Sequence, residues 1–240
     1  KIVWLDMPYA LPAGEGPHPA VIFNHGSTGS GRNPRIYRRR AALEGVARLL
    51  TANGFAVFFP QRRGRGKSGG TYGEGLAADG SGYSGDRRIA LAGVDRALED
   101  IGIACDHVAW RDDVDAARMV VAGVSRGGVL AIAYAGLGRS RLMGAINFNG
   151  GWLGRLHATH NGINTEVFRR GAAFARPSLW LYGSYDQYYR IRDCEAYFNA
   201  MVDAGGAGTF HRFPKGHNLV SYPKLWWPLV SRYLSQAIGG

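Results

Sequence analysis

The most informative segment of the chain is residues 119–135, which read MVVAGVSRGGVLAIAYA. Its first four residues are an unbroken apolar run, typical of a buried β-strand, and residues 129–137 predict a helix. Between the two lies Gly123-Val-Ser-Arg-Gly127, a G-x-S-x-G pentapeptide. A strand that turns at once into a helix holds the central residue in a strained conformation with its side chain exposed. We therefore predict that Ser125 is a nucleophile, placed at a helix N-terminus that favours developing negative charge.

The same alternation of strands and helices continues on both sides of this segment. Further strands are predicted at residues 20–23, 55–59, 145–148, 179–182 and 209–213. Helices are predicted at residues 43–50, closed by Gly54, and at 91–101, 196–202 and 229–238, while glycine-rich residues 60–85 predict a loop. This pattern indicates an α/β fold with a mostly parallel sheet covered by helices on both faces. No linker or shift in composition divides the chain, so we expect one domain over residues 1–240.

Composition excludes several classes of protein. The 240 residues are 46% hydrophobic and 20% charged, a globular composition that excludes intrinsic disorder. Two cysteines, Cys105 and Cys194, are too few for a disulfide scaffold or an all-cysteine zinc site, although one bridge between them stays open. No apolar run reaches the roughly 18 residues of a membrane helix. The chain begins at Lys1, so a removed signal peptide also stays open and no compartment is predicted.

The net charge of +11 comes from 29 basic and 18 acidic residues. The basic residues are not interleaved with aromatic residues as on a nucleic-acid stacking surface, so no nucleic-acid partner is expected. Four cations that follow the predicted strand 55–59 would form a positive rim attracting anionic substrates: Arg62, Arg63, Arg65 and Lys67. In the alternative interpretation, nearby carboxylates neutralise these cations, such as Glu74, Asp79 and Asp86. Residues 61–68 nearly match a phosphate-binding loop, but no helix is predicted after them, so nucleotide binding is not expected.

A serine hydroxyl needs a base to take its proton, and the base needs an acid to orient it. Of the seven histidines, His217 follows the last predicted strand, and Asp186 follows the strand before it. Both therefore lie at carboxyl ends of strands, where open α/β sheets build their sites. Asp193 is the rival acid, but its position at the start of a predicted helix indicates an N-cap. The predicted catalytic triad is Ser125, Asp186 and His217.

An oxyanion hole requires two backbone N–H groups beside the nucleophile. One is expected from Arg126, which follows the nucleophile directly. The other is expected from the loop Asn24-His-Gly-Ser-Thr-Gly, which follows the first predicted strand. Within that loop Ser27 is the best placed donor and Thr28 is the alternative. His25 is expected to shape the turn.

Five short motifs together resemble the α/β-hydrolase superfamily: His25-Gly26, Arg63-Gly-Arg-Gly-Lys-Ser68, Gly123-Val-Ser-Arg-Gly127, Gly183-Ser-Tyr-Asp186 and Gly216-His217. The compact length and the spacing of the motifs look most like the branch related to dienelactone hydrolase. This resemblance implies a central sheet of roughly eight strands, helices on both faces and no large lid. Dienelactone hydrolase itself has a cysteine nucleophile, whereas this chain has Ser125. Relatives with a serine are mostly esterases, with some peptidases of the prolyl oligopeptidase type.

The predicted function is a serine hydrolase that cleaves carboxylic esters of small molecules by acyl transfer. No metal, organic cofactor or membrane partner is expected. Two alternatives stay open, a small peptidase of the prolyl oligopeptidase type and a catalytically silent scaffold used for binding. His157 lies with His160 in the one irregular stretch between predicted strands. Without a lid the pocket should be open and shallow, lined by Trp152, Tyr185, His157 and Tyr72.

Overall fold

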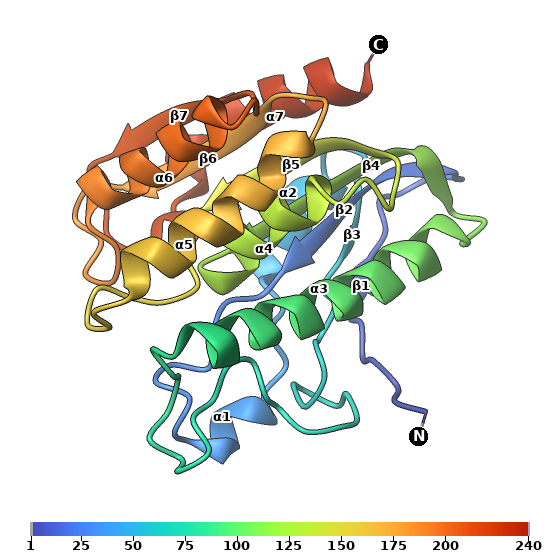
Figure 1. Ribbon diagram of the computed structural model, residues 1–240. Helices are drawn as coiled ribbons and strands as arrows, with labels where there is room; N and C mark the ends of the chain where they lie inside the picture. The colour runs from blue at the N-terminus through green and yellow to red at the C-terminus, as the bar shows by residue number, and fades with distance from the viewer. Residues whose placement is uncertain (1, 240) are drawn as a thin grey trace.

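A seven-stranded β-sheet runs through the centre of the computed structural model, which describes residues 2–239 (Figure 1). The strand order is β1-β3-β2-β4-β5-β6-β7, and all neighbours are parallel except β1, which runs antiparallel to β3. The strands are β1 (Tyr9–Ala10), β2 (His18–Asn24), β3 (Ala56–Phe58), β4 (Val114–Val124), β5 (Leu142–Phe148), β6 (Ser178–Gly183) and β7 (Gly208–Phe213). The described sheet thus has one strand fewer than the roughly eight that the resemblance implies.

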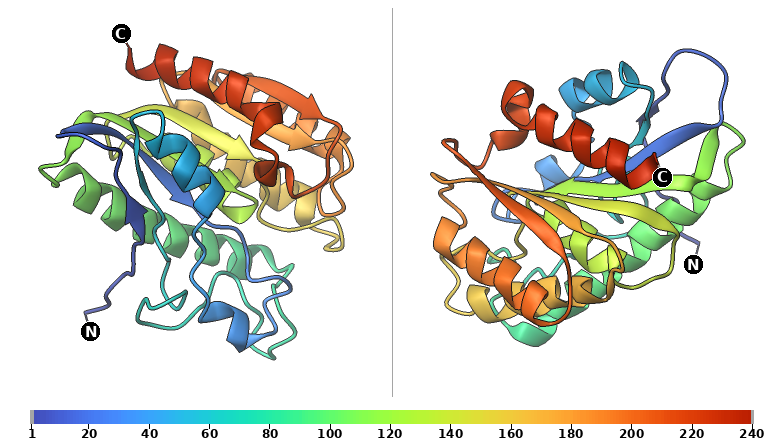
Figure 2. Two further views of the ribbon diagram at one scale, coloured as in Figure 1. Left: turned by 180° about the vertical axis from the view of Figure 1, so that it is seen from behind. Right: turned by 90° about the horizontal axis from the view of Figure 1, so that it is seen from above.

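Helices cover both faces of the sheet. The helices are α1 (Pro34–Tyr37), α2 (Glu44–Thr51), α3 (Arg87–Ala109), α4 (Arg126–Ala135), α5 (His160–Arg169), α6 (Ile191–Asp203) and α7 (Pro223–Ile238). One layer consists of α3, α4, α5 and α6, and the opposite layer consists of α2 and α7 (Figures 1 and 2). Two short 3₁₀ turns complete the helical structure, η1 (Arg170–Ala173) and η2 (Leu219–Ser221). The sheet is therefore buried on both faces, as the sequence predicts.

Strand β2 shows why the buried strands could be recognised. Its Ala20 and Ile22 side chains pack into the core under α3 to α6, and Val21 and Phe23 pack into the core under α2 and α7. All four residues are at most 3% exposed. Because neither face of a parallel sheet meets water, such a strand reads as an unbroken apolar run.

Two predictions for the second half of the chain are wrong. Residues 160–169, expected to be irregular, form α5, and the buried Ile163 and Val167 lie one turn apart on it. Asp193, expected as an N-cap, is the third residue of α6, and Arg190 is the cap residue instead. The carboxylate of Asp193 still lies in the first turn, where the helix dipole favours a negative charge.

The two cysteines are free and buried, Cys105 in α3 and Cys194 in α6. The bridge that the composition left open is therefore not formed. Burial raises the pKa of the Cys105 thiol to about 12, so it stays protonated at neutral pH. Among residues 2–239, we find no helix with the length and apolar character needed to cross a bilayer.

Candidate active site

Ser125 occupies the sharp turn between β4 and α4. Its φ of 57° and ψ of −123° lie in a region that non-glycine residues rarely adopt. The turn is tight because Gly123 and Gly127 pack against backbone, and a Cβ on Gly127 would collide with the carbonyl oxygen of Asn24. The strained serine between two obligatory glycines is the geometry that the G-x-S-x-G pentapeptide predicts.

The loops after β6 and β7 bring Asp186 and His217 together. His217 Nδ1 lies 2.7 Å from Asp186 Oδ2. The two loops are packed so closely that a Cβ on Gly183 would collide with carbonyl oxygens of Lys215 and Gly216. Asp186 therefore engages one ring nitrogen of His217 and leaves Nε2 available.

The Asp186 side chain is fully buried, and every contact that the structure gives it is a hydrogen-bond donor. Besides His217, Oδ2 accepts from Asn149 Nδ2 at 2.8 Å. Oδ1 accepts from the backbone N–H groups of Tyr188 at 2.8 Å and Tyr189 at 3.2 Å. Four donors thus hold a carboxylate that burial alone would disfavour.

Tyr189 connects His217 with Ser125. Its ring centroid lies 5.6 Å from that of His217, and its hydroxyl donates to the carbonyl oxygen of Gly151. The Gly151 N–H in turn donates to the Ser125 carbonyl oxygen at 3.2 Å. Burial raises the pKa of the Tyr189 phenol, and the neighbouring Ser125 partly offsets that rise. Ser125 and the His217 imidazole therefore both lie next to Tyr189.

The loop after β2 lies directly against Ser125. A Cβ on Gly26 would be 3.1 Å from Ser125 Cβ, a tight contact that would require one of the two segments to shift slightly. The Thr28 N–H is already occupied, since it donates to the Tyr83 hydroxyl at 3.0 Å. Within residues 2–239 the Ser27 N–H has no acceptor, and the Arg126 N–H opens α4 without an intrahelical acceptor. Ser27 and Arg126 therefore fit the two expected oxyanion donors better than Thr28.

His25 fixes the direction of the Ser27 N–H. Burial, aided by Arg62, lowers the pKa of His25 to about 3, so the imidazole is neutral. Its Nε2 accepts from the Arg62 N–H at 3.3 Å, which leaves the ring proton on Nδ1 to donate to the Gly26 carbonyl at 2.7 Å. That carbonyl and the Ser27 N–H belong to one planar trans peptide and point in opposite directions. The histidine thus turns the N–H away from itself.

The four residues expected to line the pocket lie in different environments. Trp152 and Tyr72 are buried, at 1% and 5% exposure, whereas Tyr185 is 74% exposed. His157 is partly exposed, and burial followed by the nearby Arg126 lowers its pKa. Only His157 and Tyr185 therefore present accessible side chains, and Trp152 contributes to the core.

Two of the four cations of the expected positive rim are paired with carboxylates, whereas Arg65 donates to the Ile36 carbonyl oxygen. The Arg62 guanidinium is buried against the Glu74 carboxylate, and Arg63 Nε lies 2.6 Å from Asp100 Oδ1. The alternative interpretation is therefore correct for Glu74, but Asp86 instead caps α3 by accepting from the Ile89 N–H at 2.9 Å. As expected, no helix follows the loop 61–68 directly.

Two site residues were not predicted from the sequence: Asn149, which supports Asp186, and Tyr189, which lies beside the imidazole. Of these, Asn149 has a sequence signal, since it follows the strand β5 directly. Glu74 was predicted only as one of several carboxylates that could neutralise the basic loop. The part of the chain that the structure describes contains no group of three or more histidine, cysteine or acidic side chains able to hold a metal ion.

Comparisons with known proteins confirm the predicted fold. A family model described as serine aminopeptidase, S33, matches residues 21–157, more than half of the chain. Among solved structures, the chain resembles DcsB in complex with its substrate analogue, with a TM-score of 0.73 at 13% identity over 99% of this chain and 96% of that chain. It also resembles Est1E from Butyrivibrio proteoclasticus with bound ferulic acid, with a TM-score of 0.71 at 16% identity over 99% and 97% of the two chains.

A third similar structure is a candidate dienelactone hydrolase from Klebsiella pneumoniae, with a TM-score of 0.63 at 19% identity over 98% of this chain and 100% of that chain. No curated protein sequence matches the chain. At these identities the structures share the fold with this chain. They are α/β-hydrolase neighbours over their whole length, so the architecture expected from the motifs is correct.

Proposed function

Because this chain belongs to the serine aminopeptidase S33 family of α/β-hydrolases, we propose that it cleaves carboxylic esters by acyl transfer through Ser125, His217 and Asp186. The observations that carry the proposal are the strained Ser125 turn and the Asp186–His217 pair, whose Nδ1–Oδ2 distance is 2.7 Å, with Tyr189 next to both. The expected exposure of the Ser125 side chain is wrong, since the residue is only 7% exposed. Backbone strain of this kind is concentrated at functional sites, which supports a catalytic role for the residue.

In the proposed mechanism, Ser125 Oγ attacks the ester carbonyl while His217 Nε2 takes its proton. The N–H groups of Arg126 and Ser27 bind the oxyanion of the tetrahedral intermediate. His217 then gives the proton to the departing alcohol, which leaves an acyl group on Ser125. Water, deprotonated by the same imidazole, attacks this acyl-enzyme. His217 then returns the proton to Ser125 Oγ as the bond between Ser125 and the acyl group breaks, which releases the acid and restores the serine. Asp186 holds the ring and stabilises the imidazolium that forms in each half-reaction.

Small carboxylic esters are the favoured substrates. The full-length likeness to the ferulic acid-bound Est1E and to a candidate dienelactone hydrolase supports a carboxylic acid derivative. Tyr188 is 50% exposed with its ring centroid 4.7 Å from that of His217, so a substrate would meet this side chain together with Tyr185 and His157. A peptidase is the second candidate, because the family that contains this chain takes its description from aminopeptidases.

The test compares the wild-type chain with Ser125→Ala, using Ser231→Ala on the exposed side of α7 as the matched control. Ester turnover with p-nitrophenyl acetate should fall by about 10⁴-fold or more in Ser125→Ala, and the control should keep wild-type turnover. A fluorophosphonate probe should label the wild-type protein and fail to label Ser125→Ala.

Three outcomes separate the candidates. Turnover of esters above amides supports the esterase, and faster turnover of an aminoacyl p-nitroanilide supports the peptidase. Folded wild-type protein that neither takes the probe nor cleaves either substrate would contradict the proposal and support a binding scaffold.

A further inference from the structure

Glu74 is a buried carboxylate that the proposed mechanism does not use. It lies in the irregular loop between β3 and α3 and is 4% exposed. Its carboxylate contacts Arg62 Nε and accepts from Arg62 Nη2 at 3.3 Å and from the Tyr72 hydroxyl at 3.1 Å. Burial alone would raise the pKa of this carboxyl, but Arg62 outweighs it and the pKa falls to about 2. Glu74 is therefore ionised at every working pH.

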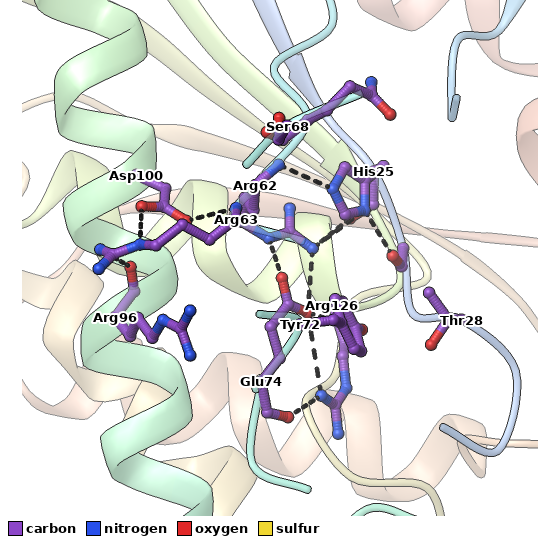
Figure 3. Close-up of polar contacts among 12 residues, drawn as sticks. His25, Thr28, Arg62, Arg63, Ser68, Tyr72, Glu74, Arg96, Asp100 and Arg126 are labelled. Atoms are coloured by element: carbon purple, nitrogen blue, oxygen red, sulfur yellow. Dashed lines mark hydrogen bonds and ion pairs between the residues drawn. The ribbon is translucent and has the colours of Figure 1, made fainter. Parts of the chain in front are cut away.

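Arg62 also contacts the loop after β2. Its Nη2 donates to the carbonyl oxygen of His25 at 3.1 Å, and its backbone N–H donates to His25 Nε2 at 3.3 Å (Figure 3). His25 directs the Ser27 N–H through the Gly26 carbonyl. One guanidinium therefore joins Glu74 to the first of the two oxyanion donors.

Arg126, the first residue of α4, is the second arginine that contacts Glu74. Its guanidinium carbon lies 3.4 Å from the Tyr83 ring centroid and 4.0 Å from the Trp152 ring centroid. Its Nη1 donates to the Glu74 carbonyl oxygen at 2.6 Å and lies 4.0 Å from Glu74 Oε2. The backbone N–H of the same residue is the second oxyanion donor. Figure 3 shows Glu74 between the two arginines.

We propose that Glu74 is a positioning residue of the oxyanion hole, because its carboxylate binds Arg62 and lies 4.0 Å from Arg126 Nη1, so that one buried counterion holds both guanidinium groups and with them the separation of the Ser27 and Arg126 N–H groups. This inference rests on the proposed acyl transfer at Ser125. Without the carboxylate, two buried guanidinium groups would lack their shared counterion and would repel each other. The two donors would then shift relative to the carbonyl carbon that Ser125 attacks.

The neighbouring pair of Arg63 and Asp100 provides a matched control. The Asp100 carboxylate is also buried, and it accepts from Arg63 Nε at 2.6 Å and from the Arg63 N–H at 2.8 Å. The Arg63 guanidinium contacts only Asp100, Glu99 and the Arg96 carbonyl among the described residues. Asp100→Asn, in α3, therefore removes the buried counterion of Arg63, the residue after Arg62, without touching either oxyanion donor.

The experiment measures how well each variant stabilises an oxyanion. Hydrolysis of an oxygen ester is compared with hydrolysis of the thionoester of the same acid and alcohol, whose sulfur fits an oxyanion hole poorly. For Glu74→Gln we expect kcat for the oxygen ester to fall about 10- to 100-fold with little change in KM, as for a misplaced donor. The preference for oxygen over sulfur should shrink, and fluorophosphonate labelling should slow.

Asp100→Asn should keep the oxygen preference and the labelling rate of the wild type, whatever it loses in thermal stability. If Glu74→Gln fails to fold, Arg62→Lys serves instead, because a lysine ammonium keeps the charge but cannot bridge Glu74 and His25 as a guanidinium does. An unchanged oxygen preference in a folded Glu74→Gln or Arg62→Lys variant overturns the inference, and so does an equal loss in Asp100→Asn. If the wild-type protein neither labels nor hydrolyses esters, the proposed function fails with it.

Discussion

Replacing Asp186 by asparagine tests the acid of the triad with the smallest change of shape. The carboxylate accepts from two adaptable side chains at Oδ2 and from two fixed backbone N–H groups at Oδ1. An amide has only one oxygen, so its NH₂ must face one of these pairs. The backbone donors of Tyr188 and Tyr189 cannot turn away, whereas the amide of Asn149 and the ring of His217 can.

The amide nitrogen of Asp186→Asn is therefore expected to face His217. Asn149 can then present its buried Oδ1, which has no partner in the described structure. His217 can accept at Nδ1 only by moving its proton to Nε2, and an Nε2 that carries a proton cannot serve as the base for Ser125. We expect kcat to fall by about 10⁴-fold. Because the partners re-pair, stability should fall by only about 1–3 kcal/mol.

The assay measures the steady-state kcat for an ester and the thermal unfolding of the same protein preparations. Asp193→Asn is the control, since its carboxylate lies 3.6 Å from His160 Nε2 and does not contact His217. That variant should keep kcat within about 3-fold of the wild type, because the Asp193 carboxylate pairs with His160 and Arg192 and with no residue of the triad. Folded Asp186→Asn that retains more than about one-tenth of the wild-type kcat, a loss of only ~1.4 kcal/mol in transition-state stabilisation, would contradict the role given to Asp186.

Three further predictions follow from the same geometry. The pKa of His25 is lowered to about 3 from an ordinary value of 6.5, so the unfolded chain binds a proton first as the pH falls. The free energy of unfolding, measured by urea denaturation, should therefore fall between pH 7.5 and 4.5 by roughly 2–3 kcal/mol more in the wild type than in His25→Asn. Equal falls in the two proteins would contradict a buried neutral imidazole. A Cβ on Gly26 would press on Ser125, so Gly26→Ala should lower kcat by about 10-fold, while Gly45→Ala, in open space on α2, should raise the melting temperature slightly without affecting kcat. The thiols of Cys105 and Cys194 should react with a thiol reagent only after unfolding, and a reductant should leave the melting temperature unchanged, because both are free and buried.

Much of the fold could be predicted because buried parallel strands carry a strong signal. Strands β2 to β6 each contain a buried apolar run that the sequence shows directly. Strand β7, which reads GTFHRF, has no such run and none of its residues is fully buried. Helix α5 was missed because Asn161, Gly162 and Thr165 have low helix propensity, which obscured the spacing of Ile163 and Val167. Tertiary packing of those two apolar side chains outweighs the propensity of their neighbours.

The candidate site was only partly predictable for a related reason. Ser125, Asp186 and His217 each follow a strand, and the parallel topology brings such positions to one edge of the sheet. Glu74 and Arg62 lie 12 residues apart within a glycine-rich loop, and no periodicity relates them. Their contact depends on the path of that loop. This path cannot be predicted from the sequence, because each glycine can adopt many backbone conformations.

The position of His217 has a consequence for how the protein fails under stress. Its loop follows β7, an edge strand that pairs only with β6 and none of whose residues is fully buried. Ser125 instead follows β4, which is paired on both sides and buried along its second half. Native proteins open in cooperative parts, and lightly buried edges open first. On warming, β7 and the His217 loop should therefore open while the Ser125 turn stays folded. The resulting molecules would keep their hydrophobic core but would no longer hydrolyse substrate. Heat inactivation would then precede melting, and amide exchange in β7 would track the inactivation.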